Sequence, residues 1–274
     1  MPFQVSRLFR KHIAWPQEHG AWAFLLSPLL AGVAAGGRWT MATTWLVTGA
    51  LAAFLMRQPI AIAVKVFARR RSRRDFSPAL FWSGLYGFVG LFVVVQLVRL
   101  RAAYLLWLTV PGILVFLWHL HLVAHRAERR RMDVEVVASG SLALSAPAAL
   151  WLAQGHPTAE GILLWLLLWF QAAASIVYAY ARLNQRSWQI IPPLNQRLRA
   201  GWRGLCYTTF NLVTVALLGG IGWVSPWLWL AYALQWMETV WGVLHPAVHT
   251  KPTTIGIRQF TVTALFTLLF VLTW

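Results

Sequence analysis

Residues 15–32 decide the fold, and their sequence is WPQEHGAWAFLLSPLLAG. From Gly20 onward this stretch is almost entirely apolar, which is typical of a helix that enters a membrane. Glu18 and His19 stand at the start of the apolar run, where a carboxylate and an imidazole lose hydration unless other groups pair with them. The stretch therefore predicts a first membrane helix with a polar site at its entrance.

The composition extends this interpretation to the whole chain. Its 274 residues are 59% hydrophobic and 11% charged, whereas a soluble domain carries about 25% charged residues. Apolar runs of about 20 residues, the length that crosses a bilayer, recur along the chain. The fold class is therefore an all-α polytopic membrane protein. Cys206 is the single cysteine, which excludes an internal disulfide and a cysteine-cluster metal site.

We predict about nine transmembrane helices in one domain that covers residues 1–274. The apolar runs that define them are separated by short loops that alternate between basic and uncharged or weakly charged sequence. The predicted spans are 21–37, 42–66, 79–98, 103–123, 135–154, 160–182, 205–222, 226–244 and 258–274.

The positive charges give the predicted orientation. Twenty of the 24 lysines and arginines lie in or beside the N-terminal leader and every second loop, namely 68–78, 124–133, 181–203 and 245–259. Cationic loops remain on the cytoplasmic side. The sequence therefore predicts a bacterial cytoplasmic (inner) membrane protein with a cytoplasmic N-terminus and a C-terminus on the outer side. The net charge of +17 then reflects topology, and no nucleic-acid partner is expected.

Polar side chains within or at the edges of the spans are the candidate functional residues, because such groups are costly in lipid. All of them fall in the half of the membrane that is nearest the basic loops. They are Glu18, His19, Arg57, Lys65, His119, His121, Glu135, Tyr178, Arg182, Glu238 and His245. This one-sided placement predicts a polar cavity that opens to the cytoplasm and is closed by apolar helices toward the outside.

Each candidate has a predicted role. Arg57, Lys65 and Arg182 are expected to face an anion such as a phosphate or carboxylate, which arginine binds with two hydrogen bonds. Lys65 and Arg182 also fit ordinary snorkelling to the membrane surface, and Arg57 also fits a structural pair with an acid. The other candidate substrate-binding residues are Tyr178, His121 and His245. The candidate catalytic residues, which would orient the cations or transfer protons, are Glu18, His19, Glu135 and Glu238.

The histidines of HLHLVAH, residues 119–125, were considered as metal or haem ligands. His121 and His125 are four residues apart and share a helix face. The sequence contains no tight metal signature of the HExxH kind. Interface histidines and a metal or haem site both fit this spacing, and we assign no metal site. The cofactor is left open.

Several motifs together resemble the YwiC-like family of membrane proteins. They are EHGAW (18–22), LLSPLLAG (25–32), RQP (57–59), the small-residue segment from Glu135 to Ala148, and YAYARL (178–183). The resemblance spans essentially the whole chain and implies a topology rather than a chemistry. Some members of the family are encoded near genes for anaerobic nitrate respiration, which implies a possible link to a respiratory complex.

The number of spans and the basic loops after spans 2 and 6 are also similar to the UbiA superfamily of intramembrane prenyltransferases. That resemblance implies a UbiA-like helical bundle with a cytoplasm-facing cavity. The superfamily holds magnesium and a prenyl diphosphate with aspartate-rich motifs in the stretches that correspond to 57–75 and 178–189. Those motifs are absent here, and arginine or lysine takes their place. Magnesium held by aspartate motifs is therefore not expected.

These observations lead to one principal hypothesis and three alternatives. The principal hypothesis is a cytoplasm-facing site for an amphipathic, anionic-headed molecule, an isoprenoid or a lipid, in a divergent transferase-like enzyme. The alternatives are a small-anion transporter, a non-catalytic membrane factor linked to anaerobic or nitrate respiration, and a haem or metal protein. The expected partners are membrane lipids and a hydrophobic small molecule.

Overall fold

The computed structural model describes residues 9, 11–16, 19–127 and 131–274, and the described residues form helices and loops without a strand. The prediction at Glu18 lies outside the described residues, as does the side chain of His19, whose backbone begins the first long helix. The elements are α1 (Lys11–Ala14), α2 (His19–Gly36), α3 (Met41–Phe67), η2 (Arg73–Asp75), α4 (Phe76–Arg99), η3 (Ala103–Leu108), α5 (Thr109–Ala124), α6 (Met132–Ala143), α7 (Ser145–Gln154), α8 (Ala159–Gln185), α9 (Leu194–Gly220), α10 (Trp229–Leu244) and α11 (Pro252–Thr273).

The prediction of a helical membrane protein is confirmed, although fewer crossings than nine are supported. Six helical segments of the described chain are long and apolar enough to span a bilayer: 41–67, 73–99, 103–124, 132–154, 159–185 and 252–273. Gly20–Gly36 is a shorter apolar helix. A helix also occupies the seventh and eighth predicted ranges. However, α9 begins with polar and basic turns, and the 16 residues of α10 extend only about 24 Å against a hydrocarbon core of about 30 Å.

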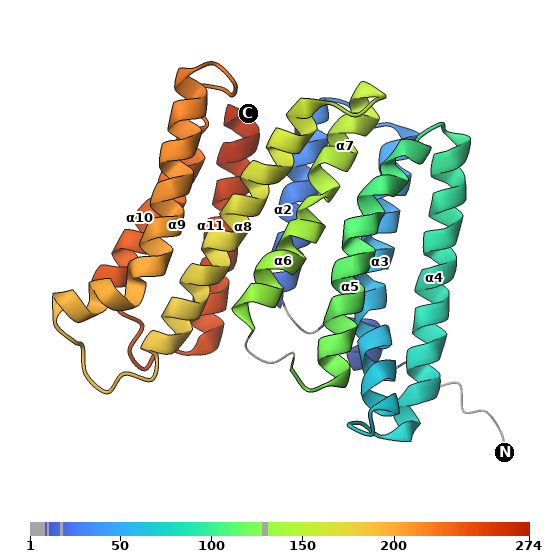
Figure 1. Ribbon diagram of the computed structural model, residues 1–274, viewed down its shortest axis with the longest axis horizontal. Helices are drawn as coiled ribbons and strands as arrows, with labels where there is room; N and C mark the ends of the chain where they lie inside the picture. Colours follow the sequence, from blue (N-terminus) through green and yellow to red (C-terminus); the bar gives the residue numbers. More distant parts are fainter. Residues whose placement is uncertain (1–8, 10, 17–18, 128–130) are drawn as a thin grey trace.

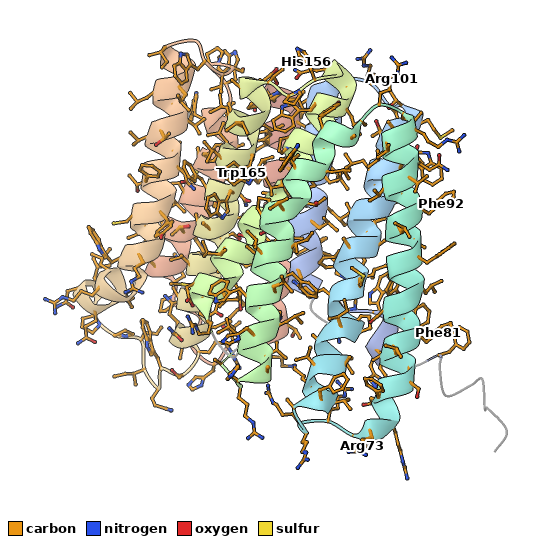
Figure 2. All side chains as sticks on the ribbon, turned by 45° about the vertical axis from the view of Figure 1, so that its right-hand side comes forward. Arg73, Phe81, Phe92, Arg101, His156 and Trp165 are labelled. Atoms are coloured by element: carbon orange, nitrogen blue, oxygen red, sulfur yellow. The ribbon has the colours of Figure 1, made fainter. Side chains whose placement is uncertain are left out.

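The long helices stand side by side in two groups (Figure 1). One group consists of α3, α4 and α5, and the other of α8, α9, α10 and α11. Between them lie α2, α6 and α7, and α2 packs against both α7 and the distant α11. The strongly basic loop that contains Arg73 lies at one end of the bundle, and His156 and Arg101, from weakly charged loops, lie at the other (Figure 2). We call the end that contains Arg73 the basic end.

Close packing of small residues holds the centre together. Gly32 of α2 lies directly on the backbone of Ala146 in α7, where an added Cβ would overlap the carbonyl oxygen and Cα of Ala146. One turn later, an added Cβ at Gly36 would overlap the side-chain Cβ of Ala153. Between helices in lipid, van der Waals contact of this kind replaces the hydrophobic effect as the main attraction. A hydrogen bond of 2.6 Å between Ser27 and Thr267 joins α2 to α11.

Gly32→Ala tests this packing. We expect the variant to lose about 1–3 kcal/mol of unfolding free energy, because the new methyl group has to displace backbone rather than a flexible side chain. Unfolding in mixed detergent micelles provides the measurement. The matched control is Gly84→Ala on α4, where a Cβ meets nothing within 4 Å; it should be neutral or stabilising by up to about 1 kcal/mol. Equal effects of the two substitutions would contradict the close α2–α7 contact.

Candidate functional site

A buried carboxylate joins three helices near the basic end. Glu238 of α10 accepts hydrogen bonds from Nε and Nη2 of Arg258 on α11, both at 2.7 Å. The hydroxyl of Tyr178 on α8 donates to Glu238 Oε1 at 2.9 Å. The side chain of Glu238 is only 9% exposed, and such a group is stable only when it is paired and hydrogen-bonded. The three side chains form a single charged network.

Gly242 allows this network to form. An added Cβ at Gly242 would overlap the ring and hydroxyl of Tyr178. The missing side chain lets Tyr178 approach α10 closely enough for its hydroxyl to reach Glu238, one turn earlier on the same helix. The local sequence of α10 therefore positions a residue of α8.

Arg182 binds neutral oxygen atoms, whereas Arg258 binds a carboxylate. Its Nη1 donates to the carbonyl oxygens of Gly242 and His245, each at 2.7 Å, and to the amide oxygen of Gln185 at 2.9 Å. The same Gln185 oxygen accepts from the backbone N–H of Ala247 at 3.1 Å. The last carbonyls of a helix have no partner within that helix. Arg182 supplies donors and a positive charge at the C-terminus of α10, where the helix dipole favours a cation.

An aromatic side chain completes the site. The guanidinium carbon of Arg258 lies 3.5 Å from the centroid of the Trp241 ring, and that of Arg182 lies 5.6 Å from it. The imidazole of His245 stacks on the same ring, with centroids 4.9 Å apart. Arg258 keeps 41% of its side chain exposed, and both Trp241 and His245 are exposed. The network therefore reaches the surface at a cation–aromatic cluster. We call Tyr178, Arg182, Glu238, Trp241, His245 and Arg258 the α8–α10–α11 cluster.

The structure brings together four of the predicted site residues and places the others elsewhere. Tyr178, Arg182, Glu238 and His245 belong to the α8–α10–α11 cluster. Arg57 and Lys65 lie on α3, which packs mainly on α4, whereas α8 packs on α6, α7 and α9. These contacts place the two α3 cations in a different helix group from Arg182 (Figure 1).

The remaining predicted residues also have neighbours of their own. Arg57 lies over the ring of Phe54 at 5.3 Å. Glu135, in the first turn of α6, accepts a hydrogen bond of 2.7 Å from the hydroxyl of Tyr180 on α8. The rings of His121 on α5 and His125, the residue that follows this helix, lie 4.3 Å apart at a tilt of 37°, and both are exposed. Among the described residues, no three histidine, cysteine or acidic side chains lie close enough to hold a metal ion.

Two hollows in the described surface lie away from the predicted residues. One, of about 280 Å³, is lined by Trp188, Gln189, Ile190, Pro192 and Gln196 in and after the α8–α9 loop. The other, of about 260 Å³, lies at the opposite end and includes Glu160, the 222–225 turn and Trp274. Neither contains a predicted site residue. The cytoplasmic cavity thus stays a prediction.

Arg258 and Trp241 were not predicted as site residues. The apolar pattern predicts a last span that begins only at residue 258, so Arg258 falls at the edge of the preceding basic loop. The helix begins earlier, at Pro252, and proline is favoured in the first turn because it has no N–H to satisfy there. Starting the helix at this proline would have placed Arg258 two turns inside it, where an arginine requires a partner.

Breaking the ion pair provides a quantitative test. Arg258→Met should lower the unfolding free energy by about 3 kcal/mol, because Glu238 is left charged and buried; we take the lower end of the usual range since Arg258 is partly exposed. Adding Glu238→Gln to the same protein should recover most of that loss. Tyr178→Phe, which removes one hydrogen bond, should cost about 1 kcal/mol. Unfolding in mixed micelles measures all three, and a double variant no better than Arg258→Met would refute the pairing.

Comparisons with known proteins agree with the motifs. Residues 15–150 match the model of the family described as YwiC-like protein; this range includes EHGAW, RQP and the Glu135–Ala148 segment but not YAYARL. The chain is 27% identical over 218 residues to a Bacillus subtilis (strain 168) protein named "Uncharacterized protein YwiC", across 72% of this chain and 83% of that relative. No solved structure matches the chain significantly. Together, the two matches support the classification of this chain as a YwiC-like protein.

Proposed function

We propose that this protein binds an amphipathic molecule with an anionic headgroup, an isoprenoid diphosphate or a lipid, at the basic end of its bundle. The observation that carries the proposal is the setting of Arg258. Both carboxylate oxygens of Glu238 and the Trp241 ring fix its guanidinium, while much of the side chain remains exposed. A guanidinium held in this way is a preorganised donor for phosphate or carboxylate.

The chemistry of the guanidinium limits how a headgroup would be bound. Nε and one N–H of Nη2 of Arg258 already donate to Glu238, so an external anion would be bound through Nη1 and the second N–H of Nη2. The imidazole of His245 stacks on the same tryptophan ring as Arg258, and its Nδ1 contacts the carbonyl oxygen of Trp241. When this imidazole is protonated, its Nε2 can donate a hydrogen bond to an anion. Glu238 is therefore a positioning residue in this proposal, since it acts through Arg258 rather than on the ligand.

The adjoining surface of α10 suits an apolar tail. Met237, Trp241 and Leu244 are all exposed, and their spacing of four and three residues places them along one face of the helix. A tail lying along this face would extend into the membrane while the headgroup stayed at Arg258. A cationic site next to an apolar helix face matches the headgroup and tail of an isoprenoid or lipid molecule in one leaflet of the membrane.

The enzymatic extension of this proposal is a divergent, UbiA-like prenyl transfer in a bundle of nine crossings. A helix lies in each of the nine predicted ranges of the described chain, and we propose that α2, α9 and α10 cross the membrane together with the six longer apolar segments. Asp75, the aspartate of the stretch 57–75, bonds to Arg71 at 2.7 Å, which favours binding through arginine rather than through aspartate-held magnesium. We further propose that the basic end faces the cytoplasm of a bacterial inner membrane, as the positive-inside rule requires.

Ligand binding can be tested with defined probes. Farnesyl diphosphate should raise the melting temperature of the detergent-purified protein more than farnesol or inorganic pyrophosphate, because both halves of the probe contribute. Removing both charges with Glu238→Gln and Arg258→Gln should weaken the apparent Kd about tenfold or more, the loss expected for one charge-assisted hydrogen bond. Arg99→Gln, at the opposite end of the bundle, is the matched control and should keep wild-type affinity.

The outcomes of that titration separate the hypotheses. If farnesyl diphosphate and an anionic phospholipid both leave the melting temperature unchanged, the proposed function is wrong. If pyrophosphate alone stabilises the protein as well as the farnesyl compound does, the site favours the small-anion alternative. If the double variant binds as tightly as the wild type, the ligand is held elsewhere than at Arg258.

The orientation can be tested with single cysteines in a Cys206→Ser background. A membrane-impermeant maleimide added to spheroplasts should label His156→Cys but not Arg73→Cys, because these residues lie at opposite ends of the bundle (Figure 2). Arg73→Cys should be labelled only after the membrane is permeabilised. The reverse pattern would place the basic end outside and would contradict the proposed topology.

A further inference from the structure

The segment that joins α8 to α9 exposes an unusual set of large apolar side chains at the basic end. Ile190 and Ile191 lie in the loop, and Leu194, Leu198 and Trp202 lie in the first turns of α9; their exposed fractions range from 42% to 77%. The start of α9 projects sideways from the lower left of the bundle (Figure 1). In water this group would form an exposed apolar patch of the kind that marks an interaction surface.

The first turns of α9 have three distinct faces. At about 100° per residue, Leu194, Leu198 and Trp202 fall within about 80° of one another around the helix. The exposed Arg199 and Arg203 fall on a second face, beside the first. The third face is the one that packs on the protein. A helix with one apolar and one cationic exposed face is typical of segments that lie in the plane of the membrane surface.

The packed face holds this segment in a fixed direction. Gly201 lies against Val243 of α10, so closely that an added Cβ would overlap the valine side chain. Arg197 Nη1 donates to the carbonyl oxygen of Leu244 at 2.7 Å. At the start of the loop, Arg186 Nε donates to the carbonyl oxygen of Thr250, also at 2.7 Å. The apolar and cationic faces are therefore presented by a supported structure.

Charge identifies the occupant of the exposed faces. The sequence 188–203, WQIIPPLNQRLRAGWR, contains three arginines and no acidic residue. The hollow of about 280 Å³ lies between its loop and the first turn of α9. An apolar protein partner would satisfy the isoleucines and Trp202 but would bury Arg199 and Arg203 without counter-charges. Lipid satisfies both faces at once, since acyl chains contact the apolar face while headgroup phosphates contact the arginines.

We propose that residues 188–203 form an interfacial surface that binds anionic phospholipid headgroups at the basic end. This surface is separate from the α8–α10–α11 cluster and does not depend on the ligand proposed there. Zwitterionic lipid would cover the apolar face equally well, so the specific content of the proposal is selection for negative charge. Arg199 and Arg203 each contribute about fivefold selectivity, the factor for one cation near an anionic surface.

The test reads lipid identity at a single position. A benzophenone amino acid is placed at Leu198 of the full chain, in nanodiscs of equimolar phosphatidylglycerol and phosphatidylcholine. Mass spectrometry then gives the ratio of the two lipids that are photo-crosslinked. We expect phosphatidylglycerol to exceed phosphatidylcholine about 5-fold to 25-fold at Leu198. The same probe at Phe88, an exposed apolar residue on α4, should return a ratio close to one.

Two charge-matched double variants decide the role of the arginines. Arg199→Gln with Arg203→Gln should reduce the ratio at Leu198 to that at Phe88, whereas Arg73→Gln with Arg74→Gln, in another loop of the basic end, should leave it unchanged. Both pairs are exposed, and an unchanged melting temperature confirms that each variant folds. Equal ratios at Leu198 and Phe88 in the wild type, failure of Leu198 to crosslink lipid at all, or persistence of the selectivity in Arg199→Gln/Arg203→Gln would each overturn the proposal.

Discussion

A carboxylate inside an apolar bundle has to be paired, and the pairing of Glu238 governs how α8, α10 and α11 meet at the basic end. Arg258 neutralises its charge through two hydrogen bonds, and Tyr178 satisfies a further lone pair. Each partner comes from a different helix, so α8, α10 and α11 are fixed relative to one another by one charged group. Lipid offers no water to replace a lost partner, so removing Arg258 would leave the charge of Glu238 buried without its cation.

The two arginines of the cluster show how one residue type is put to different uses by its surroundings. Arg182 is buried, and its Nη1 is shared among two backbone carbonyls and the amide oxygen of Gln185, so it acts on the fold. Arg258 has a carboxylate on one side and the open face of Trp241 beside it, and it remains partly exposed. Only the second arrangement places guanidinium donors where a molecule from outside can reach them. The distinction rests on exposure, which residue identity does not reveal.

The sequence predicted much of the fold and part of the candidate site. The cost of polar groups in lipid identified Tyr178, Arg182, Glu238 and His245, which do meet. The same cost identified Arg57 and Lys65, which lie in a different helix group. Which helices become neighbours depends on close contacts such as that of Gly32 with Ala146, and the sequence does not show which residue a small side chain will contact. Arg258 was missed because the start of α11 was placed too late. The basic turns at the start of α9 were treated as an ordinary loop, although their spacing already separated leucine from arginine.

The C-terminus of α10 connects the features of the basic end. The carbonyl oxygens of Gly242 and His245 accept from Arg182, and that of Leu244 accepts from Arg197. These are the orphan acceptors of the last turn, and at a membrane edge arginines from α8 and α9 take the place of water. The same turn follows directly on Trp241, the ring on which Arg258 rests. Because Arg197 belongs to the segment 188–203, a force that moves this segment at the membrane surface acts on the end of α10. A single hydrogen bond, from Arg197 to the carbonyl oxygen of Leu244, thus joins the first turns of α9 to the helix end that carries Trp241.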